Sequence, residues 1–209
     1  ATGSMSLQGK ADHAASLAAG LALAGLAARD QVRLGCYGGG DITTVTGEDP
    51  RALPKMIHAL EGLTPGGDAT GRDAVLAWTK GKRFDRAVLI SDMLIPPDDA
   101  ERLLSSLAVS ATQRTLLHVL SEADRTPELT GTLELEDVES GETLVLESGA
   151  GITTAYQEAF VRWHRGLTRL CKRLRIQLID APVTIAPGAL LVGPLRHAGL
   201  LISNRGGSA

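Results

Sequence analysis

Aromatic residues make up only 3% of the 209 residues, so the sequence has few large rings with which to build a core. The core must therefore be formed from Leu, Ala, Val and Ile, and few side chains are present on which nucleic-acid bases could stack. The formal net charge of -3 gives no electrostatic reason to expect binding to nucleic acid or to an anionic membrane. The composition indicates a soluble globular protein that binds neither nucleic acid nor an anionic membrane.

Cysteine and long hydrophobic runs are also scarce. Cys36 and Cys171 are isolated, without CxxC spacing, and we expect both to be buried reduced thiols of a cytoplasmic protein. The longest apolar run, residues 14–28, is rich in Ala and Gly and too weakly hydrophobic to span a bilayer. No signal peptide is visible, and the chain starts at Ala1 like a fragment. Membrane association would then require a segment upstream of this chain.

The most informative stretch of the sequence is a short apolar run that ends in a carboxylate. Residues 87–90, Ala-Val-Leu-Ile, continue without alternation into Ser91 and Asp92. This pattern predicts a strand that is buried on both faces, as in a parallel sheet. Ligands of open α/β sheets bind beyond the carboxyl ends of the strands, so Asp92 is the first candidate site residue. The alternative is that Asp92 caps the next helix or opens the turn of residues 93–97.

The remaining sequence predicts alternating helices and strands. We expect helices over 10–29, 50–60, 72–80, 97–107, 153–175 and 188–198, and strands over 32–37, 42–45, 86–92, 115–120 and 176–180. Up to residue 120 this order favours a mainly parallel sheet flanked by helices, with right-handed crossovers. Residues 131–137 alternate apolar and acidic side chains, which with residues 143–146 predicts an antiparallel hairpin before the long helix.

Five oxygen-bearing side chains are candidates for a metal site. Thr2 and Ser4 lie at the start of the chain, Asp68 and Thr70 lie in a glycine-rich loop, and Asp92 ends the apolar strand. Hydroxyl and carboxylate oxygens suit Mg²⁺ or Ca²⁺ rather than zinc. Thr2 and Ser4 are two residues apart, so both side chains point the same way in an extended segment. The alternative is that the hydroxyl residues only cap the helices that follow them.

Other possible catalytic signals are weak. The five histidines are scattered along the sequence, and His118 falls in a predicted strand, where a satisfied core histidine is expected rather than a general base. No serine lies in a Gly-x-Ser-x-Gly elbow, so the sequence gives no support for a hydrolase of that kind.

The first residues resemble a known domain type. Thr2-Gly3-Ser4-Met5, followed by the helix that begins at Lys10, is similar to the Asp-x-Ser/Thr-x-Ser-Met start of von Willebrand factor A-type domains. The chain resembles more closely the family catalogued as domain of unknown function 58, regarded as a von Willebrand A-like relative. Supporting segments are 66–72, 89–92 and 135–142, with Tyr156 and Gly199–Leu200. The resemblance covers nearly the whole chain and implies one three-layer α/β domain, 1–209, that is incomplete at its N-terminus.

The resemblance also implies a metal-ion-dependent adhesion site. Thr2 and Ser4 would supply its hydroxyls and Asp92 its late-strand carboxylate, while the loop position falls on Asp68 or, through a shifted loop, on Thr70. The leading aspartate of the motif would precede Ala1 and is absent together with its strand. We therefore expect weak Mg²⁺ binding or none. Loss of a central strand would also leave backbone groups unpaired, so we expect the isolated chain to be poorly stable or self-associating.

Three functions are consistent with the sequence. The first is a non-enzymatic protein-interaction module, in which a partner carboxylate completes the coordination of a loop-bound ion. The resemblance implies a MoxR-type AAA+ ATPase as the partner. The second is an Mg²⁺-dependent phosphoryl-transfer or phosphatase-like enzyme using Asp68 and Asp92, although no nucleophile or general base is identifiable beside them. The third is a purely structural domain.

Overall fold

The computed structural model describes residues 5, 9–38, 41–63, 71–127, 132–136, 143–147 and 150–201. The described helices are α1 Lys10–Ala27, α2 Leu53–Glu61, α3 Gly71–Thr79, α4 Pro97–Ser110, α5 Glu122–Arg125, α6 Ala150–Arg173 and α7 Pro187–Leu190. The described strands are β1 Val32–Gly38, β2 Asp41–Gly47, β3 Phe84–Ser91, β4 Ala111–Leu120, β5 Thr132–Glu136, β6 Thr143–Glu147 and β7 Gln177–Pro182. A short 3₁₀ turn, Pro50–Ala52, precedes α2, and a π-helical turn, Leu191–Leu195, follows α7. The fold is mixed α/β, as the sequence predicts.

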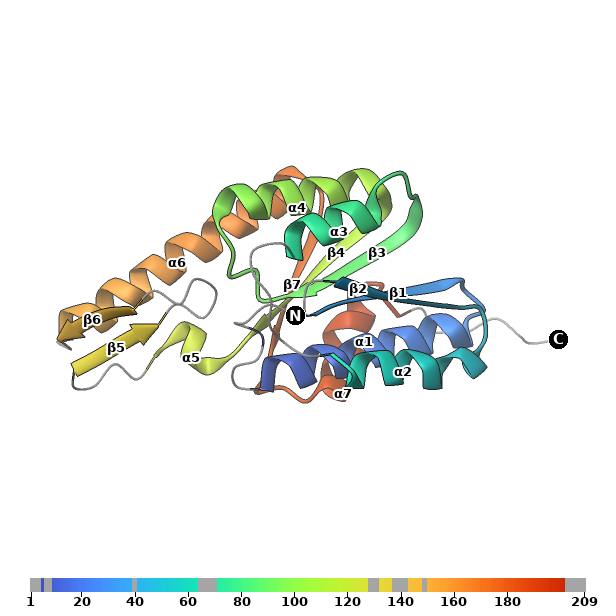
Figure 1. The fold of residues 1–209 in the computed structure, drawn as a ribbon, viewed down its shortest axis with the longest axis horizontal. Coiled ribbons are helices and arrows are strands. Elements are labelled where there is room, and N and C mark those ends of the chain that lie inside the picture. The colour runs from blue at the N-terminus through green and yellow to red at the C-terminus, as the bar shows by residue number, and fades with distance from the viewer. Residues whose placement is uncertain are drawn as a thin grey trace.

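The central sheet has three parallel strands in the order β3-β4-β7 (Figure 1). Its register places Ser91 of β3 opposite His118 of β4, and His118 opposite Asp180 of β7. Register partners in a parallel sheet point to the same face, so these three side chains form a row across the sheet. The row lies near the carboxyl ends of the strands, where the sequence places the site.

The predicted strand at 32–37 exists as β1, but its expected place in the parallel sheet is wrong. β1 pairs antiparallel with β2, and the two form a separate sheet from β3-β4-β7. Only residues 39–40 separate the two strands, and so short a connection can join only antiparallel neighbours, whereas a parallel pair needs a crossover of a dozen or more residues.

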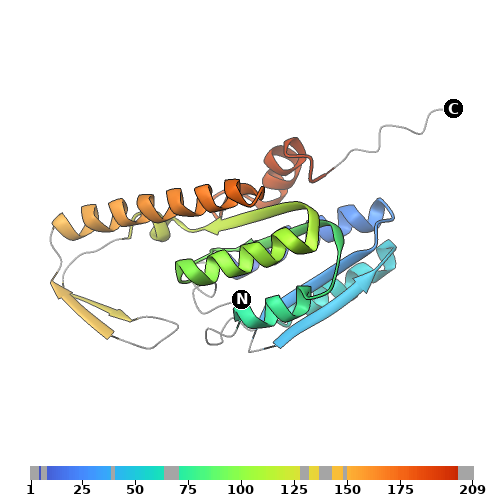
Figure 2. The same ribbon diagram turned by 90° about the horizontal axis from the view of Figure 1, so that it is seen from above.

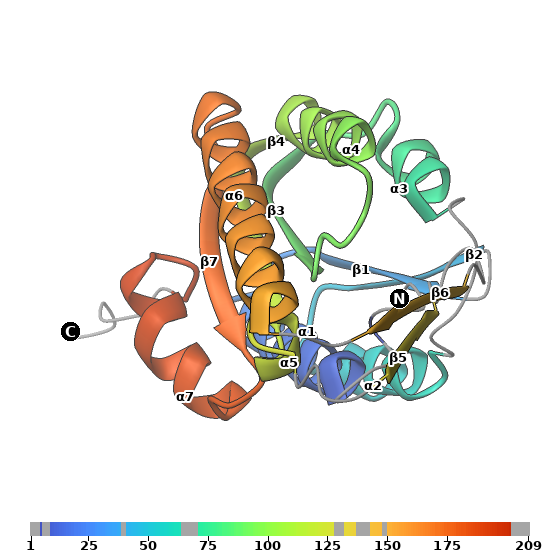
Figure 3. The same ribbon diagram turned by 90° about the vertical axis from the view of Figure 1, so that its left-hand side faces the viewer.

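Helices cover both faces of the parallel sheet (Figure 3). Leu116 of β4 packs in a core with α4 and α6, which also contains Met93 and the free thiol residue Cys171. The next residue, Leu117, points to the opposite face and packs with α1 and α7. A third cluster joins α1, α2 and the β1–β2 pair. The alternation of β4 therefore divides its side chains between two cores, because successive strand residues point to opposite faces.

The buried face of α1 contains polar as well as apolar residues. Lys10 and His13 are buried there beside Leu17 and Leu26. The hairpin β5–β6 is antiparallel, as predicted. It lies with the N-terminal part of α6 at the end of the molecule remote from the β1–β2 pair (Figure 2). In the described part of the chain, no helix is long and apolar enough to cross a membrane.

Candidate functional site

Of the five predicted metal ligands, the structure places Asp92. Thr2, Ser4, Asp68 and Thr70 lie outside the described residues. The convergence of these five oxygens on one metal ion therefore stays a prediction.

Asp92 follows β3 directly and is almost fully buried, with 1% of its surface exposed. Its carboxylate Oδ2 accepts a hydrogen bond of 3.0 Å from Nζ of Lys10, the first residue of α1. Its Oδ1 lies 3.4 Å from the backbone nitrogen of Leu94 in the turn before α4. No side chain caps α4, so the expectation that Asp92 caps the next helix is wrong, whereas its contact with Leu94 agrees with the expectation that it opens the turn. The Asp92 carboxylate therefore pairs with Lys10 and contacts the turn before α4.

A second carboxylate reaches the same lysine from the loop after β4. Nζ of Lys10 lies 3.1 Å from Oδ1 of Asp124 in α5. Asp124 is fixed by a capping box, because its Oδ2 accepts from the backbone N–H of Ser121 and its own N–H donates to Oγ of Ser121. Sequence reasoning missed Asp124. The signal that could have found it is the Ser-x-x-acid spacing directly after a buried strand.

The three groups Lys10, Asp92 and Asp124, termed here the lysine cluster, form a buried ion network. A buried charge is costly unless it is paired and hydrogen-bonded, and Lys10 meets both conditions with only 1% of its surface exposed. An Mg²⁺ ion beside Asp92 would lie within a few ångströms of this ammonium and would be repelled by it. Among the described residues, Mg²⁺ at the Oδ2 side of Asp92 would therefore have to compete with the Lys10 ammonium.

The backbone next to Asp92 is held in an unusual conformation. Met93 has a positive φ of 54°, although it is neither Gly nor Asn and is fully buried. Its N–H donates to Oγ of Ser91, and its carbonyl accepts from the N–H of Ile95. Residues held at positive φ carry strain that the surrounding structure must offset. The packing of Met93 against α4 and α6 supplies that support at the strand end.

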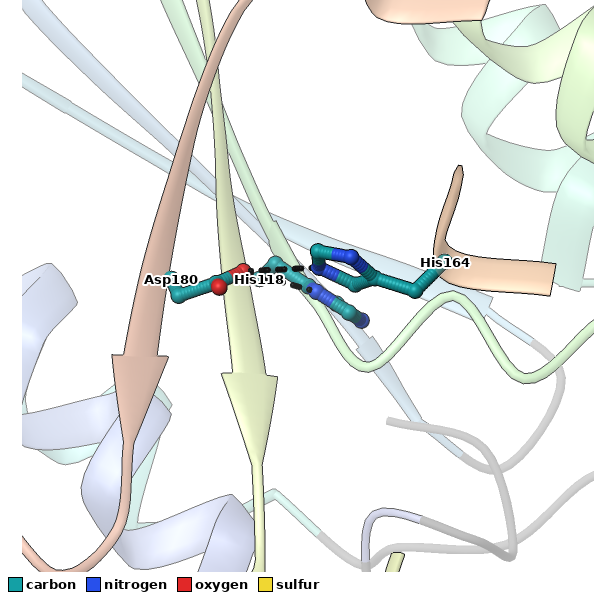
Figure 4. Close-up of side chains that lie close together, drawn as sticks. All are labelled: His118, His164 and Asp180. Atoms are coloured by element: carbon teal, nitrogen blue, oxygen red, sulfur yellow. Dashed lines mark hydrogen bonds and ion pairs between the residues drawn. The ribbon is translucent and has the colours of Figure 1, made fainter. Parts of the chain in front are cut away.

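A second polar cluster lies on the other face of the sheet. His118 of β4, His164 of α6 and Asp180 of β7 point toward one another (Figure 4), and we term them the histidine cluster. Oδ1 of Asp180 lies 3.2 Å from Nδ1 of His118 and 3.2 Å from Nε2 of His164. The hydrogen bond with His118, followed by that with His164, lowers the pKa of Asp180 to about 2.

The histidines were predicted to be scattered, and the structure corrects this prediction for two of them. His118 is fully buried and bonded at both ring nitrogens, as expected of a satisfied core histidine. Its partner His164 comes from a helix far along the chain, so neither spacing nor periodicity indicated the pair. Only the packing of α6 on β4 and β7 brings them together.

Fold and site together define a mixed α/β protein with two polar clusters near the carboxyl edge of a parallel sheet. The family model described as "Protein of unknown function DUF58" matches residues 1–165, and the chain belongs to this family. This finding confirms the resemblance to that family noted from the sequence.

Other comparisons give only distant similarity. No curated protein matches the sequence. The conserved hypothetical protein BatB from Bacteroides thetaiotaomicron, known from a crystal structure, is 14% identical in sequence to this chain. The match covers 91% of this chain and 88% of that chain, with a TM-score of 0.47. An aerotolerance-related membrane protein from Bacteroides fragilis is 15% identical, with a TM-score of 0.42 over 79% of this chain and 92% of that chain. Similarity this low assigns no function.

Proposed function

We propose that this chain is a non-enzymatic protein-interaction module, a single von Willebrand A-like domain whose adhesion-type metal site is degenerate. The observation that carries the proposal is the buried Lys10 ammonium between Asp92 and Asp124. A lysine of the chain itself supplies the positive charge at the strand end, where the family resemblance places a divalent ion. Mg²⁺ binding at Asp92 is then weak or absent, and recognition relies on the protein surface around the strand ends.

The residues around the lysine cluster suit a contact surface. Tyr156 of α6 is 39% exposed, and its hydroxyl donates to the backbone carbonyl of Asp124, so the ring is held in place at the surface. Glu122 and Arg125 flank Asp124 on exposed positions of α5. Tyr and Arg are enriched in protein interfaces, where an ordered aromatic side chain binds with little loss of entropy. By the family resemblance, the partner is a MoxR-type AAA+ ATPase.

The enzymatic alternative gains little from the described residues. Burial raises the pKa of the Cys171 thiol to about 11 and also raises that of Cys36, so neither thiol is an activated nucleophile. His118 is fully buried, and both ring nitrogens are already bonded. We propose a cytoplasmic location for this chain.

The partner proposal is tested by measuring the affinity of this chain for a purified MoxR-type ATPase by biolayer interferometry. Glu122→Lys reverses a charge on the proposed surface and is expected to weaken binding at least tenfold. Asp85→Lys makes the same kind of change at an exposed position near the start of β3, the opposite end of the sheet, and is expected to bind like the wild type. Equal affinities for both variants would contradict the proposed surface, and no binding by the wild type would favour the structural domain.

The degenerate metal site is tested separately by titrating the chain with Mg²⁺ in a calorimeter. We expect no saturable heat, because Lys10 already neutralises Asp92. Saturable binding that disappears in Asp92→Asn would contradict the degenerate site and revive the Mg²⁺-dependent phosphoryl-transfer hypothesis.

A further inference from the structure

The histidine cluster has the dimensions of a metal site. Its three ligand atoms all lie within 4.8 Å of one another, and two of the separations are 3.2 Å. Tetrahedral zinc with bonds of about 2.0–2.1 Å separates neighbouring ligand atoms by about 3.3 Å. The distances from the Asp180 oxygen to the two imidazole nitrogens therefore already match two edges of such a tetrahedron.

The hydrogen-bond partners of His118 leave room for a cation. Nε2 of His118 lies 3.0 Å from the backbone carbonyl oxygen of Asp92, which can only accept, so Nε2 carries the proton. In the neutral ring, Nδ1 then presents a lone pair to the carboxylate of Asp180 at 3.2 Å. The hydrogen bond between Nδ1 and Asp180 therefore needs a second proton on the ring, and a metal ion can take the place of that proton.

The same arrangement is typical of a histidine that binds a metal. Metal-ligating histidines usually donate their other ring N–H to a backbone carbonyl or a carboxylate, which fixes the tautomer and the ring orientation. His118 makes this contact with Asp92 from a fully buried position in β4. The first ligand is therefore held in place before any ion arrives.

The accessibility and the donor atoms of the cluster also suit an ion at this place. The side chains of His164 and Asp180 are 27% and 36% exposed, so the cluster is reachable from solvent on one side. Arg125 lies 3.7 Å from Oδ2 of Asp180, the oxygen that does not face the histidines. Oδ1 of Asp180 is the oxygen that faces the two imidazole rings. Two imidazoles and one carboxylate favour zinc, cobalt, nickel or copper over Mg²⁺ or Ca²⁺, which prefer oxygen ligands.

We propose that Nδ1 of His118, Nε2 of His164 and Oδ1 of Asp180 bind a divalent transition metal ion of the zinc type. Three protein ligands leave a fourth position for water or an external ligand. The ion joins α6 to β4 and β7, and His118 connects it to the backbone of Asp92 at the strand end. This proposal stands whether or not the chain binds an ATPase.

The test uses the chelator-stripped chain, titrated with Zn²⁺ in a calorimeter and with Co²⁺ in an absorption spectrometer. We expect one ion per chain, and a Co²⁺ spectrum with the intense visible bands of four-coordination that Zn²⁺ abolishes. His164→Gln and Asp180→Asn are each expected to lower the affinity at least tenfold. His58→Gln, which changes an exposed histidine of α2, is the matched control and should bind like the wild type.

The outcomes separate a metal site from a simple hydrogen-bond network. His164 is partly exposed, so its variant should keep the wild-type circular dichroism spectrum, and loss of binding with an unchanged fold supports the site. No stoichiometric Zn²⁺ binding by the wild type would overturn the proposal. Undiminished binding by both His164→Gln and Asp180→Asn would overturn it equally, as would displacement of Co²⁺ by an equal concentration of Mg²⁺.

Discussion

The lysine cluster and the histidine cluster lie at the same edge of the parallel sheet but differ in the charge at their centre. In the first, one cation lies between two carboxylates. In the second, one carboxylate lies between two imidazole rings. Asp92 connects them, because its carboxylate binds Lys10 while its carbonyl accepts from His118. The lysine cluster has its cation built into the chain, whereas the histidine cluster gathers acceptors around a space that a proton or an external ion can fill.

The pleat of the sheet explains why the two clusters do not merge. His118 and Asp180 are register partners, and both point to the face that α6 covers. Asp92 is one residue beyond Ser91, the register partner of His118, so its side chain turns to the face that α1 covers. One residue of offset thus places a carboxylate beside a lysine rather than beside two histidines.

The largest expected effect comes from removing the built-in cation. Lys10→Met leaves the buried carboxylate of Asp92 and the partly buried carboxylate of Asp124 side by side without a positive charge. Breaking a buried ion pair in this way costs about 3–5 kcal/mol. We expect urea denaturation to show a fall of that size in the free energy of unfolding. Lys55→Met, at an exposed position of α2, should change it by less than about 0.5 kcal/mol. If Lys10→Met lowered the free energy of unfolding by less than about 1 kcal/mol, the ion pairs of the lysine cluster would not contribute to stability as a buried network does.

A smaller effect is expected from the carboxylate of the histidine cluster at low pH. The folded-state pKa of Asp180 is about 2, below its ordinary value of 3.8, so the unfolded chain binds this proton more tightly. Its contribution to stability is therefore present above about pH 4 and is lost as the pH falls through about 2. Because Asp180 is partly exposed, solvent screening reduces this contribution to about 1 kcal/mol.

Urea denaturation of the metal-free wild type and of Asp180→Asn at several pH values measures this contribution. We expect the wild type to be the more stable at pH 5 and the difference to shrink toward pH 2. A difference that stays constant over this range would contradict the assigned pKa shift.

The smallest effect comes from the backbone of the turn that joins α6, which carries His164, to β7, which carries Asp180, and both clusters stay unchanged. Arg175, between α6 and β7, is exposed and has a positive φ of 55°. Glycine adopts this conformation without strain, so Arg175→Gly should stabilise the protein by about 0.5–1 kcal/mol. Arg165→Gly, at an exposed position inside α6, should instead destabilise it by about 1 kcal/mol. Thermal melts of both variants test these signs, and destabilisation by Arg175→Gly would contradict the backbone argument.

Much of the fold could be predicted from local sequence patterns. The apolar run before Asp92 indicates a buried strand, and β3 ends at Ser91 with Asp92 directly after it. The acidic and apolar alternation of residues 131–137 indicates the hairpin strand β5. These predictions succeed because hydrophobic periodicity is set by neighbours along the chain. The prediction that β1 joins the parallel sheet was wrong, because the pairing of strands depends on contacts between residues that are distant in the sequence.

The sequence by itself determined that a carboxylate would stand at the end of a buried strand in an α/β protein of this family. It did not determine which cation the carboxylate would meet. Lys10 lies at the start of a helix whose apolar pattern gave no reason to bury a charge, and only the packing of α1 against the sheet aligns it with Asp92 and Asp124. His118, His164 and Asp180 likewise come from three elements that share no sequence period. Tertiary packing decided both clusters, because side chains distant in sequence meet only when the faces that carry them are buried together.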